Sequence, residues 1–318
     1  MRKILVAGAL GQIGSELTMG LREVYGVDNV IASSRSAKAG LEKVIESGPF
    51  EVVDITDGKK LHEVVKKNKV DTIINLAAVL SAVGEKYPDR AWDVNMNGLY
   101  NILEVGRQEN CSVFTPSSIA AFGPSTPPDN TPQDTIQRPN TMYGVTKVAG
   151  ELLCDYYYTK YGVDTRGVRF PGLISYETLP GGGTTDYAVE IYYEALKNKK
   201  YASFIAKGTK MDMMYMPDAL NAITQLLEAD PDKLIHRNAF NVTAMSFDPE
   251  EIAASIKKHI PEFELSYDVD KVKQAIADSW PNSLDDSAAK AEWGWNPEYN
   301  LETMTKDMLE KLTVKLGL

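Results

Sequence analysis

Cysteine and histidine are both scarce in this chain of 318 residues, which contains two cysteines and three histidines. Cys111 and Cys154 allow one disulfide at most, so a disulfide-stapled scaffold is excluded and a reducing compartment is favoured. The two cysteines and the three histidines (His62, His236 and His259) also lack zinc-ligand spacing. We therefore expect neither a metal site nor a secreted, disulfide-rich fold.

The sequence also lacks an excess of positive charge and any long apolar run. Lys and Arg number 34 against 44 Asp and Glu, a net charge of -10, so nucleic acid and anionic membranes are not expected partners. No segment approaches the roughly 20 apolar residues that span a bilayer. The apolar run at Ile4–Gly8 is too short for a signal peptide. We expect a cytoplasmic protein without a membrane partner.

The first half of the chain instead alternates short β-branched runs with amphipathic helical segments. This βαβ rhythm predicts a parallel sheet, because parallel strands need crossover helices. Helices are expected over Ile13–Tyr25, Leu61–Lys69 and Asp89–Glu109. The expected strands are Ile4–Ala7, Asn29–Ala32, Phe50–Val53, Thr72–Leu76, Ser112–Thr115 and a sixth that ends at Val168–Phe170.

The rhythm changes after residue 174. Helical patterns at Asp186–Lys197 and Asp218–Glu228 and a strong helix start at Asp248–Pro249 predict a smaller lobe. The fold class is therefore α/β: a Rossmann doubly wound parallel sheet with a smaller C-terminal α/β substrate lobe. We expect residues 1–174 to bind a dinucleotide and residues 175–318 mainly to bind substrate, with some elements returning to the first domain.

A glycine-rich turn follows the first predicted strand and opens the first predicted helix. Gly8, Gly11 and Gly14 have G-x-x-G-x-x-G spacing, which lets the backbone approach a pyrophosphate without a Cβ clash. The helix start supplies free N–H groups for the phosphates. An ordinary βα turn is the alternative, but the position between a strand and a helix favours dinucleotide binding.

The sequence discriminates less sharply between the two nicotinamide cofactors. An acid at the end of the second strand would bind the ribose hydroxyls of NAD, but Ser34 and Arg35 stand there. Ser34 can bond a hydroxyl or a 2′-phosphate, and Arg35 can meet that phosphate or point to water. Asp54 is either a contact to the adenine edge or the cap of a helix that starts near Thr56.

A tyrosine and a lysine stand four residues apart, at Tyr143 and Lys147, and so share one face of a helix. A neighbouring cation favours the ionised form of a phenol, which can then act as a general base. The pair Ser117–Ser118 ends the fifth strand, where a hydroxyl can hold the substrate oxygen. Asn95 or Asn97 could orient the lysine through water, and an exposed helix pair or a structural polar contact is the alternative throughout.

Taken together, these motifs resemble the extended short-chain dehydrogenase/reductase superfamily. The resemblance covers essentially the whole chain and implies Tyr143, Lys147 and Ser117 as catalytic residues. It rests on Gly8–Gly14, Asp54–Asp57, Asn75–Ala78, Ser117, Tyr143 with Lys147, Arg169–Gly172, Asp285–Ser287 and Trp293–Pro297.

Three further segments, Leu80–Glu85, Leu179–Ala188 and Ser279–Pro281, resemble the short-chain L-threonine 3-dehydrogenase family. That resemblance implies NAD as cofactor, no metal, and oxidation of the threonine 3-hydroxyl to 2-amino-3-oxobutyrate. It implies substrate contacts from Ser81, Ser117, Tyr143, Thr184, Thr185 and Trp280. It implies cofactor contacts from Gly8, Leu10, Gly11, Gln12, Ile13, Gly14, Ser34, Arg35, Asp54, Ile55, Leu76, Ala77, Ala78, Tyr143, Lys147 and Pro171. Ser34 stands where the family usually has Asp, which weakens the expectation of strict NAD preference.

Several alternatives remain open on the sequence. Thr184 or Thr185 can cap a helix, and Trp280 can be a core aromatic. The runner-up activity is an NAD-dependent nucleotide-sugar 4-epimerase or dehydratase, and a third hypothesis is a non-catalytic dinucleotide sensor. By resemblance, the helices at Asp89–Glu109 and Tyr143 would pair across a two-fold axis in a homodimer, with burial inside the monomer as the alternative. A sugar nucleotide would need basic groups such as Lys207, Lys210 and Arg237.

Overall fold

The computed structural model describes residues 2–37, 41–179 and 183–318, which fall into two compact units. The first unit comprises residues 1–118, 141–169 and 223–240, and the second comprises residues 119–140, 170–222 and 241–318. The assignment of dinucleotide binding to residues 1–174 and substrate binding to residues 175–318 stays a prediction.

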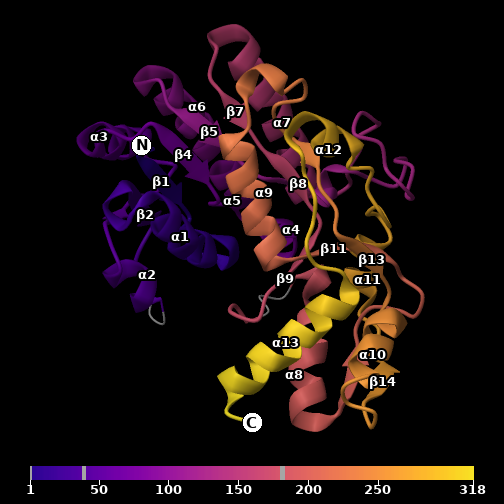
Figure 1. Cartoon of the computed structure of the whole chain (residues 1–318). Helices are drawn as coiled ribbons and strands as arrows, with labels where there is room; N and C mark the ends of the chain where they lie inside the picture. The colour runs from indigo at the N-terminus through magenta and orange to yellow at the C-terminus, as the bar shows by residue number, and fades with distance from the viewer. Residues whose placement is uncertain (1, 38–40, 180–182) are drawn as a thin grey trace. The chain divides into compact units, whose positions relative to one another are not determined.

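The first unit is built on a six-stranded, wholly parallel sheet (Figure 1). The strand order is β3-β2-β1-β4-β5-β7, so the order reverses between β1 and β4. Ligands of open α/β sheets bind where the strand order reverses, outside the carboxyl ends of the strands. This confirms the predicted Rossmann sheet. The strands are β1 (Ile4–Ala7), β2 (Val30–Ser34), β3 (Phe50–Val52), β4 (Thr72–Asn75), β5 (Ser112–Phe114) and β7 (Thr165–Arg166).

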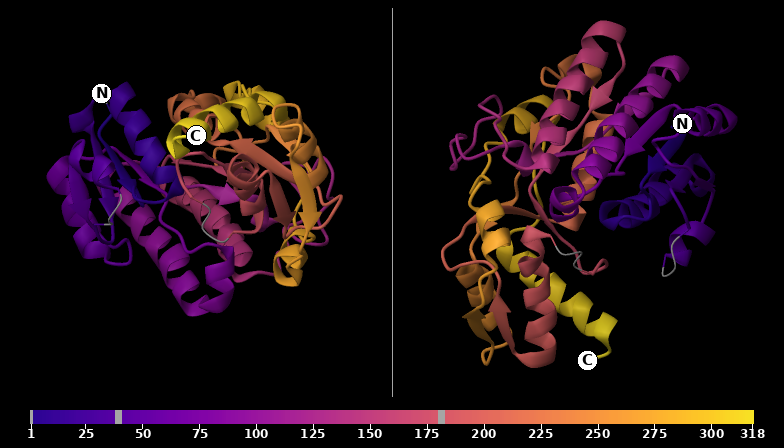
Figure 2. Two further views of the ribbon diagram at one scale, coloured as in Figure 1. Left: turned by 90° about the horizontal axis from the view of Figure 1, so that it is seen from below. Right: turned by 180° about the vertical axis from the view of Figure 1, so that it is seen from behind.

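Three helices cover one face of this sheet, and their buried side chains form one core cluster with alternate strand residues. Figure 2 shows two of them, α6 and α7, side by side in the view from behind. The helices of that face are α3 (Gly58–Asn68), α6 (Gly98–Glu109) and α7 (Met142–Tyr161). The cluster includes Leu5, Ile31 and Ile73 from the strands and Leu61, Leu103 and Cys154 from the helices. The unit also contains α1 (Gln12–Tyr25), α2 (Glu42–Glu46), α4 (Ser81–Lys86) and α5 (Pro88–Trp92).

Two predicted elements of the first half differ from the structure. The sixth strand of the sheet is Thr165–Arg166, and Val168–Phe170 forms a separate strand, β8. The apolar pattern missed Thr165–Arg166 because it contains an arginine. The guanidinium of Arg166 is buried and donates hydrogen bonds to the carbonyls of Leu226 (2.6 Å) and Ala229 (2.8 Å). The helix predicted over Asp89–Glu109 is interrupted by a π-helical turn at Asp93–Asn97.

Among its described residues, the second unit contains a mixed three-stranded sheet, a parallel strand pair and several helices. In the sheet, β11 (Met211–Tyr215) lies between β9 (Gly172–Ile174), which is parallel to it, and β13 (Met245–Phe247), which is antiparallel. β10 (Lys200–Ser203) pairs with β14 (Glu264–Tyr267). The helices are α8 (Tyr187–Asn198), α10 (Pro249–Lys257), α11 (Lys271–Ala277), α12 (Ser287–Trp293) and α13 (Leu301–Leu316). This is the smaller α/β lobe that the sequence predicts.

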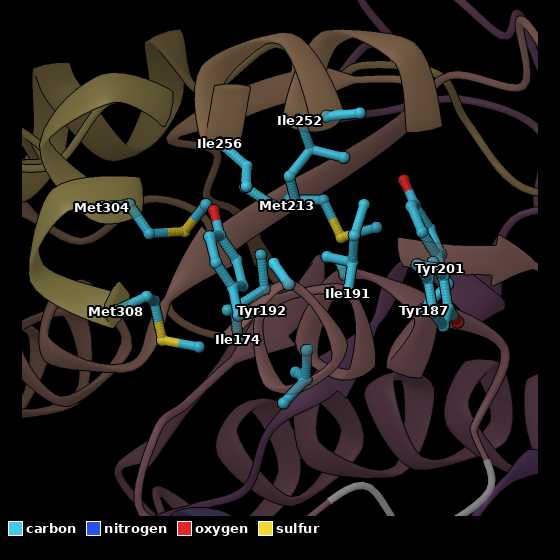
Figure 3. Packing of buried hydrophobic residues seen from close by; sticks show 14 of the residues in the cluster. Ile174, Tyr187, Ile191, Tyr192, Tyr201, Met213, Ile252, Ile256, Met304 and Met308 are labelled. Carbon is cyan, nitrogen blue, oxygen red and sulfur yellow. The ribbon is translucent and has the colours of Figure 1, made fainter. Parts of the chain in front are cut away.

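Side chains from three of these helices fill the core of the second unit. In Figure 3, Met304 and Met308 point from α13 toward Tyr192 of α8, and Ile252 and Ile256 approach from α10. All five are buried. Because this core is independent of the sheet in the first unit, the second unit forms its own compact body.

Most of the remaining elements lie where the chain passes from one unit to the other. They are β6 (Ser117–Ser118), β8 (Val168–Phe170), α9 (Met216–Glu228) and β12 (Phe240–Asn241). Short 3₁₀ turns lie at Val27–Asn29, Ile119–Ala121, Thr184–Asp186 and Pro231–Lys233. Across the described ranges, every helix falls short of the length and apolar character needed to cross a membrane.

Candidate active site

The glycine turn after β1 is as closely packed as a dinucleotide-binding turn requires. Gly8 has φ of 85°, and a Cβ there would lie 2.7 Å from the backbone nitrogen of Ala77. A Cβ on Gly14 would lie 2.2 Å from the carbonyl oxygen of Gly8. Both positions therefore require glycine, and they pack the turn against the end of β4 and the start of α1.

The start of α1 keeps its backbone donors uncapped. Gly11 is the exposed N-cap residue and contributes no side-chain cap. Its own N–H donates to the carbonyl of Gly8 at 3.0 Å, and the first helical bond runs from Ser15 to Gly11. The N–H groups that follow, at Gln12 and Ile13, are those that a phosphate binds at a helix start. Leu10, which lies between Gly8 and Gly11 in the turn, is buried.

Within the described residues, the end of β2 presents Ser34 and Arg35 rather than a carboxylate that could bind ribose hydroxyls. Ser34 is half-buried there, and Arg35 is exposed. The hydroxyl of Ser33 is buried and has no hydrogen-bond partner among the described residues. A polar group buried without a partner is costly, so this edge has unused capacity for a bound hydroxyl.

Asp54 is held in a local turn rather than capping a helix. Its Oδ1 accepts from the backbone N–H (3.0 Å) and the hydroxyl (2.8 Å) of Thr56. The cap of α3 is instead Asp57, which accepts from the N–H of Lys60, so the helix-cap alternative for Asp54 is wrong. Ile55 is buried beside Gly98, and only its backbone can meet a ligand.

The end of β4 contributes backbone groups and one buried amide side chain. Leu76, Ala77 and Ala78 are half-buried, and the N–H of Leu76 donates to Ala7 at 2.8 Å. Asn75 Oδ1 is buried without a hydrogen-bond partner among the described residues. The glycine turn, the uncapped helix start and these unsatisfied polar atoms together fit a bound dinucleotide.

Tyr143 and Lys147 lie on one face of α7, as the sequence predicts. The Lys147 ammonium is 5.3 Å from the centroid of the Tyr143 ring and donates to the carbonyl of Pro116 at 2.7 Å. Thr141 caps the helix by accepting from the N–H of Gly144 at 3.0 Å. The lysine therefore joins the tyrosine to the segment that carries Ser117.

Ser117 is tied to a buried ion pair that the sequence did not reveal. Its hydroxyl donates to Glu151, one turn beyond Lys147 on α7. Arg169 donates to both oxygens of the same carboxylate, at 3.0 and 2.8 Å, and all three side chains are buried. Glu151 stands at i+4 from Lys147 and i+8 from Tyr143, so the helical period was the one available signal.

Asn95 lies in the π-helical turn and bridges two segments of the site. Its Oδ1 accepts from the N–H of Val79 at 2.8 Å, while Nδ2 donates to the Val79 carbonyl and to the Thr146 hydroxyl, both at 3.1 Å. Asn97 donates a local bond, to Asp93 at 2.9 Å. Asn95 is thus the asparagine that contacts the tyrosine helix, through Thr146 rather than directly through Lys147. Ser81 is buried and begins α4, two residues after Val79.

In the second unit, Thr184 and Thr185 follow residues 180–182, the first part of the predicted loop, which lie outside the described residues. Thr184 is buried. The methyl group of Thr185 packs against Gly172. The cap of this turn is the carboxylate of Asp186, which accepts from the N–H of Gly183 at 2.7 Å. The alternative that a threonine caps the helix is therefore wrong, and neither threonine hydroxyl has a partner among the described residues.

Trp280 is half-buried and packs against Ile119, Phe122 and Leu284. The segment after it is anchored, because the N–H of Leu284 donates to the buried carboxylate of Asp212 at 2.8 Å. Pro171, also in this unit, is buried between β8 and β9. Trp280 therefore packs as a core aromatic side chain over the buried part of its ring, in agreement with the structural alternative.

The basic residues that a sugar nucleotide would use are already paired. Lys207 contacts Glu250 at 3.3 Å, and Lys210 contacts Glu251 at 3.1 Å. Arg237 is buried and contacts Asp164 at 2.9 Å. Among the described residues, no cluster of three or more His, Cys, Asp or Glu is arranged to hold a metal ion.

The chain is closely similar to known proteins over its full length. An uncharacterized epimerase/dehydratase of Staphylococcus saprophyticus is 58% identical over 316 residues, covering 99% of this chain and 98% of its own. An L-threonine dehydrogenase from Clostridium difficile is 68% identical, with a TM-score of 0.98 and coverage of 99% and 98%. A monomeric L-threonine 3-dehydrogenase from a metagenome is 44% identical, with a TM-score of 0.93 and coverage of 98% and 99%.

Residues 4–243 match the NAD dependent epimerase/dehydratase family, and this range includes the glycine turn, Ser117, Tyr143 and Lys147. Relatives of more than half identity align from end to end with the chain. This chain therefore belongs to the NAD dependent epimerase/dehydratase family.

Proposed function

We propose that this protein is an NAD-dependent L-threonine 3-dehydrogenase that needs no metal and acts in threonine catabolism. The observation that carries the substrate is the similarity to the L-threonine dehydrogenase of Clostridium difficile, at 68% identity over 99% of the chain. The observation that supports the chemistry is the Tyr143–Lys147 pair on a helix of the unit that also contains the glycine turn.

In this proposal Tyr143 is the general base that removes the proton of the threonine 3-hydroxyl. Lys147, whose ammonium lies beside the tyrosine ring, stabilises negative charge on the phenol oxygen and bonds the nicotinamide ribose. Bound NAD would supply the hydride acceptor, and the protein supplies orientation and electrostatics.

Ser117 is the proposed hydroxyl that holds the reacting oxygen. Its hydrogen is directed to Glu151, but Arg169 gives that carboxylate two further donors. Ser117 can therefore turn toward the substrate without leaving a buried charge unpaired.

The cofactor would bind at the glycine turn, with its pyrophosphate at the start of α1. Beyond Gly8, Gly11 and Gly14, the proposed cofactor contacts are Leu10, Gln12, Ile13, Ser34, Arg35, Asp54, Ile55, Leu76, Ala77, Ala78 and Pro171. NAD is the proposed cofactor, although Ser34 lacks the negative charge that would repel a 2′-phosphate.

Threonine is a zwitterion, and its carboxylate needs hydrogen-bond donors. Ser81, Thr184 and Thr185 are the proposed donors, and the two threonine hydroxyls have no other partner among the described residues. Trp280 is the proposed apolar contact. We further propose a cytoplasmic homodimer that pairs through α6 and α7, whose exposed apolar residues include Tyr100, Leu152 and Tyr156. Sedimentation of the purified protein tests this.

The test is an absorbance assay for NADH with L-threonine, other β-hydroxy amino acids and nucleotide sugars, each with NAD and with a chelator present. NADH from L-threonine in the presence of chelator supports the proposal. Conversion of a nucleotide sugar without net NADH would instead identify a 4-epimerase or dehydratase. Binding of NAD without turnover of any compound would identify a non-catalytic dinucleotide sensor.

A further inference from the structure

The helix that begins with Ser81 also reaches the start of the helix that carries Tyr143. Glu85, near the end of α4, accepts a hydrogen bond from the backbone N–H of Met142 through its Oε1, at 2.6 Å. Met142 is the first residue of α7 and directly precedes Tyr143. A carboxylate of one short helix thus binds the amino-terminal end of another, 57 residues away in sequence.

This bond satisfies a backbone donor that α7 cannot satisfy alone. The first N–H groups of a helix have no partner within it, and a negative charge is favourable at that end. Thr141 provides the cap for Gly144 at 3.0 Å, and Glu85 provides the partner for Met142. The two bonds fix the turn of α7 on which Tyr143 lies.

The two helices are also in direct contact beside the tyrosine. Gly84 is buried, and a Cβ placed on it would lie 3.9 Å from the Cβ of Tyr143 and 3.5 Å from that of Ala91. An added Cβ would thus make ordinary van der Waals contacts with both side chains, so α4 lies next to Tyr143 across a gap that a methyl group would fill. A shift of α4 toward α7 would therefore displace Tyr143.

The other end of the same segment is bound to α7 as well. Asn95 holds the N–H and the carbonyl of Val79 and contacts Thr146, three residues after Tyr143. Residues 79–85 are thus braced against α7 at both ends, by Asn95 at Val79 and by Glu85 at Met142. Ser81 and Glu85 stand four residues apart and so share one face of α4.

We propose that Glu85 is a positioning residue for the dehydrogenation, because it fixes the position of the turn that carries Tyr143 relative to Ser81. This rests on the proposed function, in which Tyr143 removes the substrate proton and Ser81 contacts the substrate. A base must lie within hydrogen-bond reach of its proton, and a misplacement of about 1 Å costs up to 10²-fold in rate. Loss of the Glu85 bond should therefore lower kcat clearly, even where the Tm changes little.

The experiment compares Glu85→Ala, Glu85→Gln and a control, Glu251→Ala. Glu251 is also a carboxylate that accepts from a backbone N–H at a helix start, that of Asp248 at 2.9 Å, but on α10 of the second unit. For each variant one measures kcat, the KM for L-threonine, the KM for NAD, the Tm, and hydrogen exchange in residues 142–146.

We expect Glu85→Ala to lower kcat by about tenfold and to speed exchange at the start of α7, with the KM for NAD within about twofold. Glu85→Gln keeps an accepting oxygen and should recover kcat to within about threefold of the wild type. Glu251→Ala should lower the Tm but leave kcat unchanged.

Faster exchange in Glu85→Ala with wild-type kcat would overturn the proposal, because the bond would then be structural only. Unchanged exchange would overturn it by showing that the bond does not hold α7. If the wild type forms no NADH from L-threonine, the proposed function fails. The exchange data would still decide whether Glu85 holds the start of α7, and the kinetic comparison would move to the best substrate of the panel.

Discussion

Gly172→Ala tests the proposed role of Thr185 in substrate binding without replacing Thr185 itself. Gly172 begins β9, and a Cβ there would lie 2.4 Å from the Sδ of Met213 and 2.7 Å from the Cγ2 of Thr185. Both distances are shorter than real Cβ contacts. The added methyl group must therefore displace Met213, Thr185 or both.

The displacement can be worked out from these distances. To reach an ordinary contact of 3.4 Å, the Cγ2 of Thr185 must move by 3.4 − 2.7 = 0.7 Å and the Sδ of Met213 by 3.4 − 2.4 = 1.0 Å. Met213 is fully buried in the core of the second unit, so its movement is resisted. Overpacking of this kind destabilises by about 1–3 kcal/mol. A shift of about 1 Å in a group that positions substrate costs up to 10²-fold.

We therefore expect Gly172→Ala to raise the KM for L-threonine at least tenfold, a change of about 1.4 kcal/mol, while the KM for NAD stays the same. Initial rates of NADH formation measure both constants, and thermal unfolding measures the destabilisation. Gly20→Ala is the matched control, because a Cβ on Gly20 meets no atom within 4 Å. A destabilised Gly172→Ala enzyme with wild-type threonine kinetics would refute the assignment of Thr185 to the substrate site.

The remaining predictions concern the base, the cofactor, the substrate donors and pH. Tyr143→Phe should lower kcat by about 10² or more with NAD affinity preserved, and turnover near the wild-type rate would exclude Tyr143 as the base. Ser34→Asp should widen the ratio of kcat/KM for NAD over NADP, and a wild-type preference for NADP would contradict the NAD assignment. Ser81→Ala and Thr185→Ala should each raise the KM for threonine by about tenfold or more, since a charged carboxylate loses a donor worth about 1.5–3 kcal/mol. Burial raises the pKa of Asp212 from 3.8 to about 8, so the folded state binds the proton more tightly and the free energy of unfolding should fall as pH rises from 3.8 toward 8. Asp212→Asn should flatten this dependence of the free energy of unfolding on pH, measured by denaturant titrations at several pH values. An unchanged dependence would assign it to other groups.

Most of the Rossmann sheet could be predicted because its inner strands, such as Ile4–Ala7 and Thr72–Asn75, carry short apolar runs followed by a helix signal. Parallel strands buried on both faces must be apolar along their whole length, so pattern alone identifies them. Thr165–Arg166 escaped because its arginine is buried and paired with main-chain carbonyls. A contact with residues some sixty positions away is invisible to local pattern.

The same distinction between local pattern and distant contacts applies to the residues of the candidate site. Spacing along one helix, such as Tyr143 to Lys147, is fixed by the helical period and so can be read from the sequence. The bond of Ser117 to Glu151, that of Glu85 to Met142 and that of Asn95 to Val79 depend on which elements lie side by side.

In each of these bonds a polar side chain of one element satisfies a polar group of another, and no local preference of the chain specifies the pairing. Polar groups that are buried or stand at a helix end need hydrogen-bond partners. A motif that places such a group in a site therefore implies a partner residue that is not part of the motif. For the start of the helix that carries Tyr143 that residue is Glu85, which accepts from the N–H of Met142, and for Ser117 it is Glu151. The chemistry of this site should therefore depend on carboxylates that never contact the substrate.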